Sequence, residues 1–414
     1  MRLNLRRHSL SNGLRVVLAP DPAVPVVGLA LAYDVGSRDE VPGRSGFAHL
    51  FEHLMFQGSQ NVAKGGHMEL VQSVGGRCNG STSEDQTVYT QVLPSRELDL
   101  GLWLEADRMQ ALALTQENFE NQRSTVIEER RERVDDSPYG LASLRLKELS
   151  WRSWAYAHPV VGSFEDLDAA TLDDARAFHG AFYRPDNAVL ALAGQMDEES
   201  VLQRLEAWFG PIEAGGAPPR QPIDEAGRDG AHERQTDPLA RLPAVFVNHP
   251  CGGFGHEDFF ALEMLETVLL RGPSSRAWRR LVVDRPIALQ VGGGFDAHRG
   301  PGLFGLSGVV SSEEGLEPLR AGWQELLDEV SQQLIPDDEW AKAITRVRSA
   351  RVFGLESPLA QAAGLARAEL SEGNAEWEND YLDGIAAVTP DAVREVAARC
   401  FASAAAVVME VVPA

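Results

Sequence analysis

The chain is poor in cysteine. Its 414 residues include only Cys78, Cys251 and Cys400, which lie far apart and form no Cys-x-x-Cys pair. A small, odd and scattered set argues against a disulfide framework and against a cysteine-based metal site, because both need thiols brought together in groups. We therefore expect a protein of a reducing compartment.

The chain also lacks a long hydrophobic run. Its longest apolar stretch, Val24–Ala32, contains a proline and is far shorter than the ~20 residues that a membrane-spanning helix needs. From Met1 to Leu18, apolar and polar side chains alternate around Asn12-Gly13, which indicates two strands joined by a turn and not a secretion signal. The prediction is a cytoplasmic protein without membrane contact.

Positive charge is scarce as well. The chain has 38 lysine and arginine residues against 61 acidic ones, which gives a net charge of −23. Such a charge repels nucleic-acid phosphates and anionic lipid surfaces, so we expect neither as a partner. It would suit a cationic ligand, and a soluble acidic surface without a specific role is the alternative.

What the chain does contain is enough length and apolar content for two domains. Alternating and 3.6-residue patterns mix strands and helices throughout, and the Gly/Pro-rich stretch 212–242 has the composition of a linker. We predict an α+β fold of two homologous domains, residues 1–211 and 243–414, each an antiparallel-rich β-sheet packed with helices. The main segments are strands near 14–18, 26–31, 77–83, 87–93, 188–193, 244–248, 287–295 and 303–310, and helices near 46–57, 64–74, 96–112, 116–134, 139–149 and 172–182.

A faint internal repeat supports two related domains. Residues 167–171, a helix and the strand Val189–Leu192 in the first half are echoed by residues 385–389, a helix and Val407–Glu410 in the second. A repeat of this length predicts that each half ends in the same helix–strand unit.

The most informative stretch is His49-Leu50-Phe51-Glu52-His53. On a helix the two histidines are ~40° apart on one face, one turn from each other, so both imidazoles can bind the same metal ion while Glu52 reaches a water on it. The flanking residues are apolar, and ionisable groups in such a helix are costly without a partner. The alternative, a pair of ordinary buried histidines, is much rarer for the full His-x-x-Glu-His pattern.

Two histidines do not complete a hydrolytic zinc site, which usually has three protein ligands and a water. The predicted helix 117–133 offers Glu128 and Glu129 after the apolar pair Val126-Ile127. Chemistry alone does not choose between the two acids, and a solvent-exposed helical face is the alternative for either.

The sequence around these residues resembles that of a known protein family. His-x-x-Glu-His is the inverted zinc-peptidase motif, and its surroundings are similar to the pitrilysin/insulinase family, in particular to the zinc-bearing subunits of its short, processing-peptidase-like branch. The resemblance covers essentially the whole chain. The segments that carry it are Asn12–Leu14, Gly36–Glu40, His49–His53, Gly75–Thr82 with Asp85, Thr87 and Tyr89, Leu104–Met109, Arg133–Gly140 and Val388–Pro390.

The resemblance implies a Zn²⁺ cofactor held by His49, His53 and a Glu about 76 residues after the second histidine, which falls on Glu129. Glu52 is then the general base that takes a proton from water. Gln122 stands seven residues before Glu129 where the family commonly has a second Glu, and we expect it to tune the site as a hydrogen-bonding neighbour. The strand Arg77–Thr82 is implied to bind an extended substrate through its backbone, with Asn79, Gly80 and Thr82 as substrate-binding residues.

One part of the family's site is absent from this sequence. The family carries an Arg and a Tyr, separated by six residues, that donate to the developing oxyanion, and here Val282 and Leu289 occupy those positions. In the short branch a second, homologous subunit without His-x-x-Glu-His supplies the pair, and the two bowl-shaped halves enclose a chamber. We expect a heterodimer of that kind, with a homodimer as the alternative. Arg285 is nearby in the sequence and could substitute as a donor to the oxyanion, but its interpretation as a surface residue is favoured.

The leading prediction is a zinc endopeptidase subunit that acts on peptides or unfolded polypeptides inside the chamber. A non-catalytic structural subunit of the same fold is a second hypothesis, and the intact set of His49, Glu52, His53 and Glu129 argues against it. A protease dedicated to one precursor peptide is a third.

Overall fold

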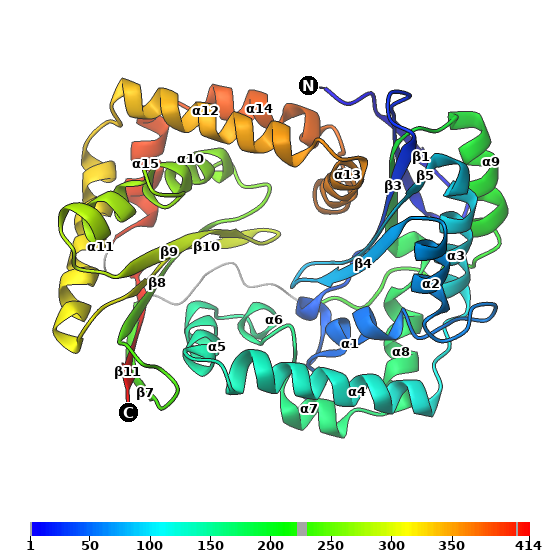
Figure 1. Ribbon diagram of the computed structural model, residues 1–414, viewed down its shortest axis with the longest axis horizontal. Helices are drawn as coiled ribbons and strands as arrows, with labels where there is room; N and C mark the ends of the chain where they lie inside the picture. The colour runs from blue at the N-terminus through cyan, green and yellow to red at the C-terminus, as the bar shows by residue number, and fades with distance from the viewer. Residues whose placement is uncertain (1, 222–229, 403–404) are drawn as a thin grey trace. The chain divides into compact units, whose positions relative to one another are not determined.

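The computed structural model describes residues 2–221, 230–402 and 405–414. The chain forms two compact units, each built from several segments. The first unit comprises Met1–Glu129, Pro159–Pro222 and Val352–Asp380, and the second comprises Arg130–His158, Ile223–Arg351 and Tyr381–Ala414. Figure 1 shows the elements of both. In the described part of the chain, no helix combines the length and the apolar character needed to cross a membrane.

The first unit is built on a six-stranded sheet. Its strand order is β1-β2-β6-β3-β5-β4, with β2 and β6 parallel and the other neighbours antiparallel. The strands are β1 (Arg6–Ser9), β2 (Arg15–Pro20), β3 (Val26–Tyr33), β4 (Arg77–Thr82), β5 (Thr87–Pro94) and β6 (Ala188–Gly194). Asn12-Gly13 does join β1 and β2 as a turn, as the sequence predicts, and the antiparallel-rich sheet is confirmed.

The described residues of the first unit also form α-helices and short 3-10 helices, of which α4 ends one residue beyond the unit, at Arg130. They are α1 (Phe47–Leu54), α2 (Gly66–Ser73), α3 (Leu98–Gln110), α4 (Gln116–Arg130), α7 (Phe164–Ala169), α8 (Leu172–Phe182), α9 (Glu198–Phe209) and α13 (Pro358–Glu372), with η1 (Ser37–Asp39), η2 (Ser95–Glu97) and η4 (Pro185–Asn187). Helix α8 has the predicted bounds, because Thr171 caps it and forms a capping box with Asp174.

The two faces of this sheet pack against different helices, because side chains alternate along each strand. Larger residues such as Leu29, Leu31 and Leu190 join the main core with α1 and α3. Small residues such as Ala30, Ala32 and Ala191 face α13. The small side chains let α13 approach closely: a Cβ on Gly28 would lie 2.4 Å from the backbone of Pro358. A segment from the last quarter of the sequence thus covers the N-terminal sheet (Figure 1).

The second unit has a five-stranded sheet of order β7-β11-β8-β10-β9. Its strands are β7 (Ala231–Asp237), β8 (Ala244–Gly252), β9 (Gln290–Ala297), β10 (Pro301–Val309) and β11 (Val407–Pro413). Its helices are α5 (Gly140–Ser150), α6 (Trp154–Ala157), α10 (Phe259–Leu269), α11 (Leu316–Gln332), α15 (Pro390–Cys400), the π-helical η3 (Arg131–Asp135) and η5 (Trp278–Asp284), and the 3-10 helix η6 (Glu313–Gly315). Helices α12 (Asp337–Gly354) and α14 (Trp377–Ala387) each cross the division between the units.

The internal repeat is confirmed by the topology. Without β1, the first sheet reads β2-β6-β3-β5-β4 and matches β7-β11-β8-β10-β9 strand for strand, including one parallel pair followed by antiparallel ones. The helices before β6 and β11 begin alike, with Thr171 and Thr389 accepting a hydrogen bond from a backbone N–H of the first turn. The two units are therefore built on one pattern.

The three-part domain division made from the sequence stays a prediction. Residues 222–229 of the predicted linker 212–242 lie outside the described residues, while β7 falls within the same stretch. The structure adds that each compact unit draws on segments from both halves of the chain.

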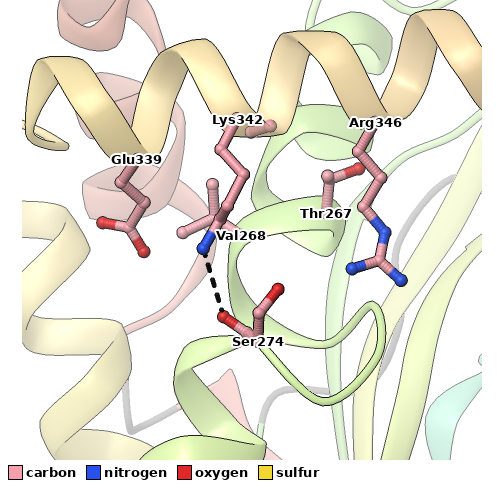
Figure 2. A pocket seen from close by; sticks show the side chains of 7 residues that line it. Thr267, Val268, Ser274, Glu339, Lys342 and Arg346 are labelled. Carbon is pink, nitrogen blue, oxygen red and sulfur yellow. Dashed lines mark hydrogen bonds between the residues drawn. The ribbon is translucent and has the colours of Figure 1, made fainter.

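Two of the cavities among the described residues lie in the second unit. One, of about 10 Å³, lies between α12 and α10 (Figure 2), where the Lys342 ammonium donates a 3.4 Å hydrogen bond to the Ser274 carbonyl. That volume is about enough for one water molecule. The other, of about 320 Å³, lies against β8, β9 and β10 and includes Asn248 and Asp296 in its lining. The linings of these two cavities contain no histidine.

Candidate metal centre

Helix α1 carries the two histidines, and its start is determined by glycine. Gly46 precedes the helix with φ of 89°, a left-handed conformation that side chains disfavour, and a Cβ there would lie 2.8 Å from the Val161 carbonyl oxygen. Helix α1 then packs its apolar side into the core through residues spaced by three and four: Phe47, Leu50, Phe51 and Leu54. This packing fixes the rotation of the helix and hence the direction of the polar side chains.

His49 and His53 point to the same place, as their spacing predicts. Their ring centroids are 5.0 Å apart, with the planes at 81°. His49 is only 8% exposed, and His53 is half-buried. Their Nε2 atoms are the ones directed at α4, since each lies close to the carboxylate of Glu129.

Glu129 completes a three-residue group. Its Oε1 is 3.6 Å from His49 Nε2 and its Oε2 is 3.3 Å from His53 Nε2, and one ligand atom from each residue lies within 4.8 Å of the others. Donors around a tetrahedral Zn²⁺ with bonds of 2.0–2.2 Å are separated by about 3.4 Å, so the spacing fits. Two imidazoles and one carboxylate are also a donor set that hydrolytic zinc sites use.

The neighbouring acid does not join this group. Glu128 is exposed, on another side of α4, while Glu129 is turned toward α1. Side-chain chemistry alone does not distinguish Glu128 from Glu129 as the third potential ligand. Among the described residues, the group of potential metal ligands contains Glu129 and not Glu128.

Glu52 lies between the histidines in sequence and beside strand β4 in space. A Cβ built on Gly80 would lie 2.9 Å from Glu52 Cγ and 3.3 Å from a ring carbon of Phe56. Only a glycine lets the β4 backbone pass this close to the carboxylate side chain. The predicted base and the predicted substrate strand are therefore neighbours.

Strand β4 is the last strand of its sheet. It pairs with β5 from Arg77↔Val92 to Thr82↔Thr87, and its other edge has no neighbouring strand in the described sheet. Asn79 is exposed on this strand, and the buried hydroxyl of Thr82 has no hydrogen-bond partner among the described residues. An unpaired edge of this kind can accept an extended peptide as an additional strand.

Gln122 lies on the same helix as Glu129 and is buried. Its side-chain amide donates a 2.7 Å hydrogen bond to Asn121 Oδ1. Its influence on the metal ligands therefore stays a prediction.

Glu105, Arg108 and Tyr89 belong to segments that carry the family resemblance, but the sequence indicates no role for them at the site. Arg108, 2% exposed, forms a buried ion pair with Glu105 at 2.6 Å, and its guanidinium lies 4.3 Å from the centre of the Tyr89 ring. The Tyr89 hydroxyl in turn donates to the Phe51 carbonyl of α1 at 3.1 Å. Burial lowers the pKa of the adjacent His67, which keeps that ring neutral. A Glu and an Arg three residues apart in a largely apolar helix are the available sequence signal.

The positions expected to hold the missing oxyanion donors lie in the second unit. Val282 lies within the helix η5, and Leu289 is 55% exposed. Arg285 is an exposed residue that donates to Glu325 at 2.9 Å, which agrees with its interpretation as a surface residue.

Two family models match the chain. The model described as insulinase (peptidase family M16) matches residues 15–163, which include His49, His53 and Glu129. The model described as peptidase M16 inactive domain matches residues 169–347.

Individual proteins agree with these matches. The zinc protease PqqE of Helicobacter pylori is 32% identical over 286 residues, 68% of this chain and 64% of the relative. An uncharacterized zinc protease of Streptomyces coelicolor is 29% identical over 402 residues, 95% of this chain and 86% of the relative. Among solved structures, a protease from Helicobacter pylori has a TM-score of 0.94 at 27% identity, with 100% of both chains covered.

Proposed function

This chain belongs to the insulinase family of peptidases, family M16, and from that premise we propose that it is a zinc-dependent endopeptidase that hydrolyses peptides or unfolded polypeptides. The observation that carries the proposal is the convergence of His49, His53 and Glu129, from two separate helices, which brings one ligand atom of each within 4.8 Å of the others.

The chain's own residues divide the chemistry between them. A bound Zn²⁺ supplies Lewis-acid chemistry, which polarises a carbonyl and makes water more acidic. The two imidazoles and the Glu129 carboxylate hold it. Glu52 accepts the proton of the attacking water and returns it to the nitrogen of the leaving peptide. Because β4 passes over Glu52 at Gly80, a peptide paired with β4 has its backbone beside the base.

This arrangement also supports a substrate class. Pairing with a strand edge uses main-chain N–H and C=O groups, which every peptide in extended conformation offers. Most main-chain groups of a folded protein are already paired within its own helices and sheets, so extended peptides and unfolded segments are the favoured substrates. Asn79, Gly80 and Thr82 are accordingly proposed as substrate-binding residues, with loose selectivity for side chains.

We further propose that the working enzyme contains a second subunit. Val282 and Leu289 have no polar side-chain atoms, and a reaction that develops negative charge on oxygen needs donors. A homologous chain without His-x-x-Glu-His that carries an Arg and a Tyr would supply them, enclosing the substrate in a shared chamber. Co-purification from the native host tests this: a second chain of similar size is expected, and full activity of the single chain would contradict it.

The catalytic proposal is tested with a matched pair of variants. Glu129→Gln should weaken zinc binding by at least about 100-fold, because a neutral amide is a poor ligand, while Glu128→Gln should leave it unchanged. Zinc content and competition with a chelator measure both. Equal zinc affinity in the two variants would contradict the assignment.

The role of Glu52 is tested separately. Glu52→Gln should retain one zinc per chain and lose cleavage of a quenched peptide, because an amide cannot accept the proton. Retained cleavage would remove Glu52 from this role. A chain that holds zinc but never cleaves peptides, alone or with its native partner, would favour the structural-subunit alternative.

A further inference from the structure

The segment Gly36–Glu40, which contains η1, is buried although three of its five residues are charged. Arg38 is 5% exposed, Asp39 6% and Glu40 2%. Burying charge is costly unless each group is paired and hydrogen-bonded. The partners of these side chains therefore indicate what the segment holds together.

One end of the segment holds the metal helix. Glu40 Oε2 accepts a hydrogen bond from the Gly46 N–H and Glu40 Oε1 accepts one from the Ala48 N–H, both at 2.8 Å. These are N–H groups at the start of α1, which have no partner within the helix. Gly46 has no side chain to cap them, so a carboxylate from another part of the chain takes that role, and its charge is favourable at a helix N-terminus.

The other end holds the turn between β4 and β5. Arg38 Nη1 donates to Asp85 Oδ1 at 2.7 Å, and the backbone N–H groups of Ser37 and Arg38 donate to the carbonyls of Ser83 and Glu84. A Cβ on Gly36 would lie 2.2 Å from the Glu84 oxygen, so the two backbones are in direct contact. Arg38 is also held by Asp34 at 3.2 Å.

A second arginine, Arg220, pairs with the two remaining acids, Asp39 and Asp34. Arg220 donates to Asp39 at 2.7 Å and pairs with Asp34 at 2.8 Å. Asp39 thus has cationic partners and Glu40 has backbone N–H partners, and such a hydrogen-bonded network makes the segment a rigid part of the first unit.

We propose that Glu40 and Arg38 are positioning residues, which hold the metal helix α1 and the substrate strand β4 at a fixed separation. Glu40 sets where α1 begins and thus where His49 and His53 meet Glu129. Arg38 sets where the β4–β5 turn lies and thus where Gly80 passes Glu52. The inference rests on the proposed function, since it assigns these residues to the same metal and substrate sites.

The helix end is tested with Glu40→Gln. An amide nitrogen in place of one oxygen faces an N–H donor, so one of the two bonds is lost. We expect zinc affinity to fall about 10-fold or more, as for other residues that orient metal ligands, and the visible absorption of the cobalt(II)-loaded chain to change.

Glu369→Gln is the matched control. Glu369 is also buried in the first unit and accepts from the Ala375 N–H at 3.0 Å and from Arg7 at 2.7 Å, but it lies on α13 at the other face of the sheet. Its loss should lower thermal stability and leave zinc affinity and the cobalt spectrum unchanged. If Glu40→Gln does not fold, Glu40→Asp replaces it, because the shorter side chain cannot reach both N–H groups.

The hairpin end is tested with Asp85→Asn, which weakens the Arg38 link. In a Glu52→Gln background, where peptide is not cleaved, the Kd of a fluorescent unfolded peptide should rise about 5-fold, within the effect of losing one charged hydrogen bond. Zinc affinity should stay within twofold of the parent. The two variants should thus affect different quantities, zinc affinity for Glu40→Gln and the peptide Kd for Asp85→Asn. A purely stabilising role would not produce this separation.

The inference is overturned if a folded Glu40 variant binds zinc within twofold of wild type, or if Asp85→Asn leaves the peptide Kd unchanged. The proposed function fails differently. In that case the wild-type chain binds no stoichiometric zinc, or His49→Ala binds it as well as wild type does.

Discussion

His249 is a fully buried histidine in β8, packed against the Phe401 ring. Neither of its ring nitrogens has a hydrogen-bond partner among the described residues. Burial therefore lowers its pKa from 6.5 to about 4, since the charged ring has nothing to solvate it.

This shift predicts a pH dependence of stability. Between pH 6.5 and about 4 the unfolded chain binds more protons at this residue than the folded chain, so the free energy of unfolding should fall as the pH falls through that window. The full shift corresponds to about 3 kcal/mol. Urea unfolding of the metal-free chain measures it, and His249→Phe should reduce the slope. Identical slopes for the two proteins would contradict the prediction.

The proposed metal ligands differ in how far the sequence predicts them. His49 and His53 lie on one helical turn, so their spacing alone places them together. Glu129 comes from a different helix, and its pairing with them is a tertiary contact that local pattern does not contain; it was reached through the resemblance to a family. Glu40 lies in the segment Gly36–Glu40, which carries part of the resemblance, but the sequence does not indicate its role. Its partners Gly46 and Ala48 are brought to it by the fold of the intervening loop.

At the scale of elements, β4 is the strand that lies beside the proposed base. Its passage over Glu52 depends on the absence of a side chain at Gly80. A strand that must move to admit a single methyl group also moves the peptide paired with it.

Gly80→Ala should therefore reduce kcat/KM for a quenched peptide by about 10- to 100-fold, the effect expected of a misplacement near 1 Å. Zinc affinity should be close to wild type, since the atoms nearest to the new methyl group belong to Glu52, Phe56 and Tyr89 and not to the proposed metal ligands. Gly180→Ala is the control: Gly180 lies in α8 with open space around it, and alanine there should stabilise the helix slightly. Equal kcat/KM for the two variants would show that β4 tolerates the methyl group.

Elements with strong local signals were predicted well, and those shaped by packing were not. The capping box at Thr171 determines the start of α8, and Gly75-Gly76 follows α2 as expected. By contrast, the predicted helix 116–134 changes at Arg131 into the π-helical η3, a change of hydrogen bonding that the periodicity does not show. The contact of α13 with the first sheet is likewise a long-range contact.

At the scale of the whole molecule, the charge of −23 is the property most easily tested. An acidic protein attracts basic peptides over a distance that shortens with salt, to about 10 Å at 0.1 M. With Glu52→Gln loaded with zinc, a basic peptide should bind about 10-fold more tightly than an acidic peptide of equal length at low salt. The preference should shrink in high salt. A salt-independent preference would assign it to side-chain contacts at β4.

The composition and the repeat predicted the α+β class and the two related halves, because both follow from periodicity along the chain. They did not predict that each compact unit would combine segments from both halves. Which segments pack together is decided by complementary faces, such as the alanine-rich face of the first sheet and the Ala362–Ala366 side of α13, and no local pattern records that match.

The position of α13 has a consequence for how the protein is made. The strands of the first unit are complete by Gly194, but one face of their sheet packs against a helix, α13, that ends at Glu372. During synthesis on the ribosome, which proceeds from the N-terminus, that alanine- and valine-rich face must wait for most of the second unit to be translated. The half that carries His49, His53 and Glu129 thus emerges first and finishes folding late, and a nascent chain stalled before Pro358 would present an uncovered apolar sheet to the chaperones of its host.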